Sequence, residues 1–129
     1  MKPTALINRC LMCAALVLPL PVLAQAVSFQ AEIDCGGIVI PGDSVPYTMD
    51  FENETSASIA LDGNLTIDIP NLGTRTLRER SFTLAPNQVV SITKQLNLPG
   101  RAPNGRYVLT LTTSSADETT FDTCSFHVQ

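Results

Sequence analysis

Apolar and polar residues alternate over much of the chain, starting near residue 27. The clearest run is residues 27–35, where Val, Phe, Ala, Ile and Cys occupy the odd positions and polar residues occupy the even ones. This alternation predicts a β-strand with one buried face, because successive side chains of a strand point to opposite sides of its sheet. The same pattern recurs in residues 45–51, 65–69 and 90–98.

Turn-forming residues separate these segments. The Asp-Gly-Asn sequence at residues 62–64 predicts a tight hairpin between a strand at residues 57–61 and the strand at residues 65–69. Pro46 lies on the outward face of its strand and has no N–H, which predicts an unpaired strand edge there. Lys94 interrupts an otherwise apolar row.

The chain after residue 26 therefore contains about eight short predicted strands, and no window shows a sustained helical period. Short strands separated by turns over about 100 residues favour an all-β fold, an antiparallel β-sandwich of two packed sheets. A small β-barrel is the alternative architecture.

The N-terminal segment has the pattern of a cleaved secretory signal peptide. Basic residues precede an apolar run at residues 11–18, and small residues allow cleavage after Ala24 or Ala26. A membrane anchor is the competing interpretation, but the apolar run is much shorter than the roughly 20 residues that cross a bilayer. We therefore expect residues 1–26 to be removed and residues 27–129 to form one periplasmic or secreted domain, with no membrane insertion.

Signal cleavage changes the charge of the protein. The full chain has eight basic and twelve acidic residues and a net charge of −4; without Lys2 and Arg9 the net charge becomes −6. A nucleic-acid-binding protein needs a basic face to displace counterions from phosphates. The acidic balance therefore excludes that class, and the single His limits metal and triad chemistry.

Cleavage also leaves only two cysteines, Cys35 near the start of the mature chain and Cys124 near its end. Thiols are normally oxidised outside the cytoplasm, so we expect these two to form a disulfide, either within a sheet or across the core. The chain-entropy model assigns roughly 4 to 5 kcal/mol to so long a loop. The alternative is a reactive or metal-binding thiol pair, which lacks Cys-x-x-Cys spacing and nearby histidines.

Several turn motifs resemble those of a known family. A Pro-Gly-Asp turn at residues 41–43 leads into the second strand, which ends at Asn53; a Leu-x-Pro turn follows at residues 84–86, and a Pro-x-Gly-x-Tyr sequence at residues 103–107. In their residues and in their order along the chain, these motifs resemble those of the bacterial immunoglobulin-like modules of the CARDB type. The resemblance implies an immunoglobulin-like sandwich of about seven or eight strands and an extracytoplasmic accessory or adhesion role, with no catalytic residues to carry over.

Tyr107 and three arginines are the residues we single out. Tyr107 follows a Pro-x-Gly loop and resembles the corner tyrosines of Greek-key sandwiches, so we expect its hydroxyl to bind backbone upstream rather than a ligand. Arg75, Arg78 and Arg80 form the only basic concentration and could bind a carboxylate of a partner. A solvated or salt-bridged strand edge is the alternative explanation for these arginines.

Other chemistry is sparse. The acidic residues around the second strand lack the spacing of a calcium loop and are expected to be solvated; they are Asp43, Asp50, Glu52 and Glu54. His127 falls on the polar face of the last strand, where we expect a surface histidine. No serine lies in a nucleophile-elbow motif. We therefore expect no catalytic residue, metal or cofactor.

These features predict a monomeric, exported, non-enzymatic module that binds another extracytoplasmic protein through a sheet edge or face. A periplasmic chaperone or an inhibitor of fibre assembly falls within this class. A structural subunit of a surface fibre or adhesin is the alternative, and a small hydrolase or metal-binding protein is a third hypothesis.

Overall fold

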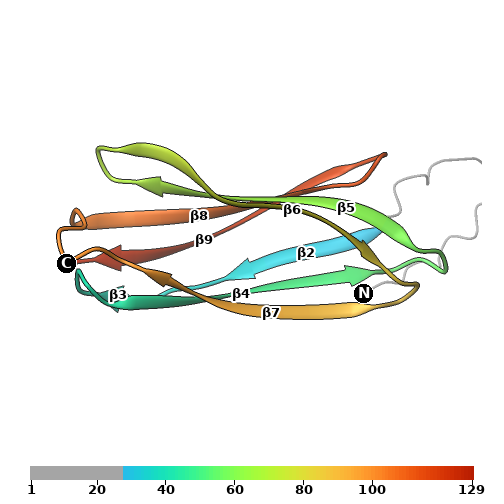
Figure 1. Cartoon of the computed structure of the whole chain (residues 1–129), viewed down its shortest axis with the longest axis horizontal. Coiled ribbons are helices and arrows are strands. Elements are labelled where there is room, and N and C mark those ends of the chain that lie inside the picture. The colour runs from blue at the N-terminus through green and yellow to red at the C-terminus, as the bar shows by residue number, and fades with distance from the viewer. Residues whose placement is uncertain (1–27) are drawn as a thin grey trace, which may run out of the picture.

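The computed structural model describes residues 28–129, and every regular element in this part of the chain is a β-strand (Figure 1). The expected signal peptide and its cleavage sites lie outside these residues. The strands are β2 (Phe29–Asp34), β3 (Ile38–Val39), β4 (Ser44–Asn53), β5 (Ile59–Ile69), β6 (Gly73–Leu84), β7 (Val89–Asn97), β8 (Gly105–Ser114) and β9 (Thr119–Val128).

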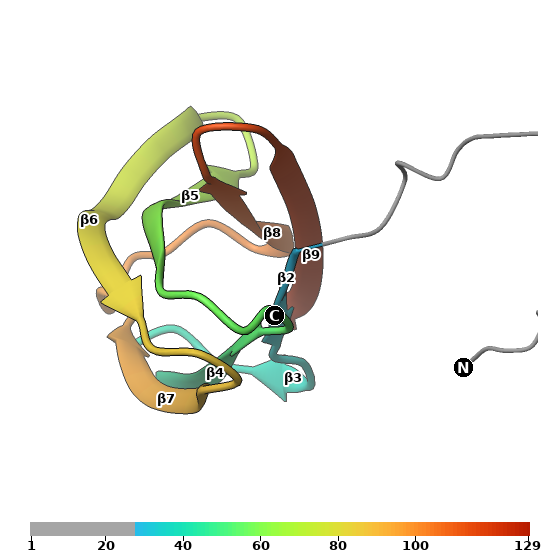
Figure 2. The same ribbon diagram turned by 90° about the vertical axis from the view of Figure 1, so that its right-hand side faces the viewer.

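The strands form two sheets that pack face to face, one in the order β2-β4-β7 and the other in the order β3-β9-β8-β5-β6 (Figure 2). All neighbours are antiparallel except the short β3, which runs parallel to β9. The inward faces of both sheets supply the buried apolar core, as the alternation predicts. The predicted sandwich is confirmed, and the barrel alternative is wrong.

The strand count matches the prediction, but the strands divide differently. The hairpin predicted at residues 62–64 is wrong, because β5 runs through these residues and pairs with β6 on one side and β8 on the other. Pairing on both sides outweighs the local turn preference of Asp-Gly-Asn. The two strands predicted at residues 57–61 and 65–69 are therefore one strand, β5. The count stays at eight because the structure contains β3, which the alternation did not predict.

Pro46 behaves as expected within a central strand. β4 pairs with β7 along its length, but β2 lies beside it only from Thr48 to Asn53. At Pro46 the strand therefore has Gln95 of β7 on one side and no β2 residue on the other. The unpaired edge predicted there is confirmed.

One side of the sandwich is closed by contacts between β2 and β9. The Cys35–Cys124 disulfide joins the residue after β2 to β9, so it links the two sheets across 89 residues of sequence. In addition, the backbone N–H of Ile33 donates to Asp122 Oδ2 at 2.8 Å. These links cover the edge of β2 that faces away from β4.

Glu118 extends this closure to the start of β2. Its Oε1 atom accepts hydrogen bonds from the Ser28 hydroxyl and from the Ser28 backbone N–H, the latter at 3.0 Å. The hydrogen bond from the Ser28 hydroxyl lowers the pKa of the Glu118 carboxyl most, and the bond from the Ser28 backbone N–H lowers it further, because both bonds favour the ionised form.

Within residues 28–129, no helix has the length and apolar character needed to cross a membrane.

Candidate functional site

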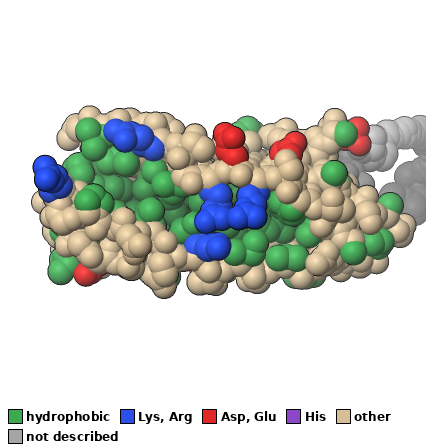
Figure 3. Space-filling view, viewed as in Figure 1, with side chains coloured by type: hydrophobic (Ala, Val, Ile, Leu, Met, Phe, Trp, Pro, Cys, Tyr) green, Lys and Arg blue, Asp and Glu red, His purple; other side chains and the backbone are tan. Residues whose placement is uncertain are grey.

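On the opposite side of the sandwich, an open groove lies between β6 and β7. These are the outer strands of the two sheets, and no backbone pairing joins them. The groove has a volume of about 390 Å³ and reaches the core residues Met49, Leu65 and Leu111. In the space-filling view this face shows a hydrophobic band with basic side chains gathered over it (Figure 3).

Gly63 forms part of the groove floor. It occupies an inward-facing position of β5, between the buried Leu61 and Leu65. The nearest atom to a Cβ placed there would be Cε1 of Phe82, at 3.5 Å. Phe82 in turn packs edge to face on Phe51 of the other sheet, with ring centroids 5.0 Å apart. The missing side chain at Gly63 leaves space beside the Phe82 ring, which deepens the groove.

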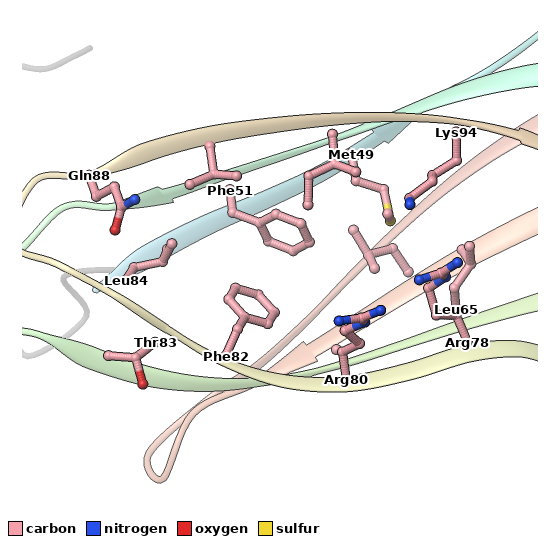
Figure 4. A pocket seen from close by; sticks show the side chains of 14 residues that line it. Met49, Phe51, Leu65, Arg78, Arg80, Phe82, Thr83, Leu84, Gln88 and Lys94 are labelled. Atoms are coloured by element: carbon pink, nitrogen blue, oxygen red, sulfur yellow. The ribbon is translucent and has the colours of Figure 1, made fainter.

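Three cations lie at one end of the groove. Arg78 and Arg80 alternate with Phe82 and the buried Leu84 along β6, so they occupy inward-facing positions of that strand. Lys94 occupies an inward-facing position of β7, two residues after Ile92. In the close-up, their charged ends point toward one another, and the phenylalanines lie farther along the groove (Figure 4).

The charges at this end are not balanced. Across residues 28–129, no carboxylate oxygen lies within 4.0 Å of a Lys, Arg or His nitrogen. None of the described residues that line the groove is acidic, although acidic residues outnumber basic ones two to one after removal of the expected signal peptide. The groove therefore combines an apolar half with a cationic half, and no carboxylate is among its described lining residues.

The arginine patch suggested by the sequence is only partly assembled. Arg78 and Arg80 line the groove, but Arg75 is exposed, pairs in register with Ile67 and is not part of the lining. Leu65 pairs with Arg78 and Thr66 with Thr76, so Leu77 is an extra residue, a β-bulge that interrupts β6 between Arg75 and Arg78.

Lys94 was not identified as a site residue from the sequence. Its signal was present, since it interrupts the buried face of its strand where the neighbouring inward positions are apolar. Only the fold shows that this position faces two arginines, because β6 and β7 belong to different sheets.

The remaining predicted residues lie away from the groove. The Tyr107 hydroxyl donates to the carbonyl oxygen of Pro103 at 2.7 Å, and its ring stacks on Phe126. Burial raises the pKa of the Tyr107 hydroxyl. His127 is exposed on β9, and the four acidic residues around β4 are exposed as well. Within residues 28–129, no three His, Cys, Asp or Glu side chains lie close enough to hold a metal ion.

No family model matches the sequence, and no curated protein matches it. Solved structures do share its fold. The CARDB domain of a Pyrococcus furiosus protein, solved in complex with di-metal ions, superposes with a TM-score of 0.63. The superposition covers 78% of this chain and 87% of that domain, at 14% sequence identity.

Parts of larger enzymes are similar too. A β-glucosidase from Erythrobacter marinus gives a TM-score of 0.63 at 12% identity, and covers 79% of this chain and 15% of the enzyme. The alkylpurine DNA glycosylase AlkC from Pseudomonas fluorescens, bound to DNA with an abasic site analog, gives a TM-score of 0.62 at 14% identity. That superposition covers 77% of this chain and 30% of the enzyme. The chain thus spans less than a third of either enzyme. At such identities the likeness concerns the fold alone. That fold is a β-sandwich similar to the one in this CARDB domain, as the resemblance of the turn motifs implied.

Proposed function

We propose that this protein is an exported, non-enzymatic accessory domain that binds another extracytoplasmic protein through the groove between β6 and β7. The observation that carries the proposal is the asymmetry of the sandwich. One side is closed by a disulfide and by side-chain hydrogen bonds, whereas the other exposes an apolar groove between two free strand edges.

Two physical properties of the groove favour a protein ligand. Free strand edges offer unpaired backbone N–H and C=O groups, which an extended segment of a partner can bind by strand addition. Apolar surface at the same place supplies the burial that such binding needs. An exported location agrees with the disulfide, since disulfides persist in oxidising compartments.

Site-specific photo-crosslinking in the intact cell envelope tests the proposal. A photoreactive residue at Thr83 or Gln88, which are both exposed and line the groove, should capture one dominant envelope protein that mass spectrometry identifies. The same residue at Thr123, which is exposed on β9, is the matched control and should not capture it. Equal capture at all three positions, or none at the groove, would contradict the proposal.

The behaviour of the purified protein distinguishes the main alternative. We expect a monomer that does not polymerise on its own. Fibres formed by the purified protein alone would instead support a structural subunit of a surface fibre.

A further inference from the structure

We infer that the groove accepts an extended acidic segment that adds to the free edge of β7. Apolar side chains of the segment enter the apolar half of the groove, and a carboxylate pairs with Arg78, Arg80 and Lys94. The inference rests on the proposed function, and it specifies the chemistry of the partner.

The edge of β7 suits strand addition better than the edge of β6. Pairing between β7 and β4 is continuous, from Ser44 opposite Asn97 to Glu52 opposite Val89. The β6 edge is interrupted by the bulge at Leu77, and bulges of this kind distort the backbone spacing that an added strand must match. A new strand beside β7 would extend the sheet from three strands to four.

The register of β7 sets the pattern of the added strand. Its inward-facing residues along the groove are Val90, Ile92 and then Lys94. Side chains of a neighbouring strand alternate with the same period, so every second one would point into the groove. The expected pattern is two apolar residues and one acidic residue at alternate positions, with the acidic residue level with Lys94.

The cations select for that acidic residue. Inward-pointing charges on an edge strand disfavour pairing with a neutral strand, because such a strand would cover the charges without compensating them. A carboxylate at the right position converts this cost into charge-assisted hydrogen bonds, which arginine can make in bidentate form. Three cations in a groove whose described lining has no carboxylate therefore reject neutral or basic strands and admit an acidic one.

A second copy of the chain is a poor occupant by the same reasoning. Two molecules that met groove to groove would bring the cations of one against the cations of the other, with no acidic residue in either described lining. Charge complementarity therefore favours a different, acidic partner segment.

Peptides of fixed composition test the inference by NMR titration of the isotope-labelled exported protein. The probe is the end-blocked peptide TETVTVTET, in which Glu, Val, Val and Glu share one face, so that either strand direction presents the expected pattern. The matched control, ETTVTVTTE, has the same composition but carries its glutamates on the other face. A second control, TKTVTVTKT, replaces both glutamates with lysine.

We expect the probe to shift the backbone amide signals of β7 and to bind at least about tenfold more tightly than either control. The preference should shrink between about 20 and 500 mM salt, because the added ions screen partly exposed ion pairs. The salt series uses the unaltered protein, so the test does not depend on any variant folding.

Variants then assign the preference to the three cations. The variant Arg78→Gln/Arg80→Gln/Lys94→Gln should bind the glutamate and lysine peptides equally, whereas Arg101→Gln/Arg106→Gln, outside the groove lining, should keep the preference. Equal binding of all three peptides to the unaltered protein, signal shifts elsewhere than β7, or self-association through the groove would overturn the inference. If the peptide results contradicted the inference but photo-crosslinks at the groove still captured a partner, only the acidic strand would be rejected. The proposed function would stand.

Discussion

Asn53 holds together the end of the sandwich where β4, β5 and β6 meet. Its buried side-chain nitrogen donates to the carbonyl oxygens of Ala57, Leu84 and Ala85 at 2.8, 3.2 and 3.0 Å. Its side-chain oxygen accepts from the backbone N–H and the hydroxyl of Thr55. One amide thus satisfies the polar groups of a turn and of the end of β6, a requirement that explains an asparagine at the end of this strand.

Replacing Asn53 with alanine should lower the free energy of unfolding by about 2 to 4 kcal/mol, because one buried and two partly buried hydrogen bonds to backbone carbonyl groups are lost. Urea denaturation measures the change. Asn97→Ala is the matched control, since Asn97 is exposed and its side chain bonds only to the Ser44 hydroxyl within residues 28–129. It should change stability by less than about 0.5 kcal/mol. A similar small effect at Asn53 would contradict the role assigned to it.

Glu118 makes stability depend on pH in the acidic range. Its hydrogen bonds from Ser28 lower the pKa of the carboxyl in the folded state, so this stabilisation is present above the unfolded pKa and is lost as pH falls through the folded one. Between about pH 5 and pH 2, the unaltered protein should therefore lose more stability than Glu118→Gln.

Thermal unfolding across this pH range measures the difference. Asp117→Asn is the matched control, because Asp117 precedes Glu118 in the same turn and no hydrogen bond reaches its carboxylate within residues 28–129. If Asp117→Asn reduced the pH dependence as much as Glu118→Gln, the contact with Ser28 would not be its source.

At the scale of strands, sequence alternation predicted most elements because one face of nearly every strand is buried. It failed at Gly63, where local turn propensity and tertiary pairing disagree. It also could not place β3, whose two residues are too few for a period to show. Both errors arise because neighbouring strands, not the local sequence, decide these positions.

Gly63→Ala should stabilise the protein by about 0.5 kcal/mol, because alanine loses less backbone entropy than glycine on folding. Its Cβ would make ordinary contacts, 3.5 Å from Phe82 Cε1 and 3.8 Å from the Arg80 carbonyl oxygen. Gly37→Ala should have the opposite effect, since the φ angle of Gly37 is 97° and strains any other residue. Urea denaturation of both variants provides the comparison. Destabilisation of both would show that Gly63 has no room for a methyl group.

At the scale of the whole molecule, the fold was more predictable than the groove. The two sheets follow from alternation and turn residues, and the disulfide follows from the two cysteines that remain after the expected cleavage. The groove joins two edge strands of different sheets, so it depends on which strands lie outermost. Lys94 faces Arg78 and Arg80 only because β6 and β7 are both edges.

Removing the disulfide should destabilise the protein more than replacing Asn53 or Gly37 with alanine. The chain-entropy model gives about 4 to 5 kcal/mol for a loop of this length, so Cys35→Ala/Cys124→Ala should lose about that much. Urea denaturation measures the loss, and the unaltered protein under reducing conditions should lose a similar amount. A loss below about 2 kcal/mol in both cases would show that the unfolded chain gains little freedom without the bridge.

The position of the disulfide also sets how the domain responds to mechanical tension. Cys35 and Cys124 enclose the strands from β3 to β8 and the first half of β9, whereas β2 and the last residues of β9 lie outside the covalent loop. A force applied at the two ends of the described chain would peel away only those outer segments and then be carried by the bridge. The segment between the two cysteines, which are 89 positions apart in sequence, contains both rims of the groove and would stay unextended under load. The proposed binding surface would therefore remain assembled while the ends are pulled.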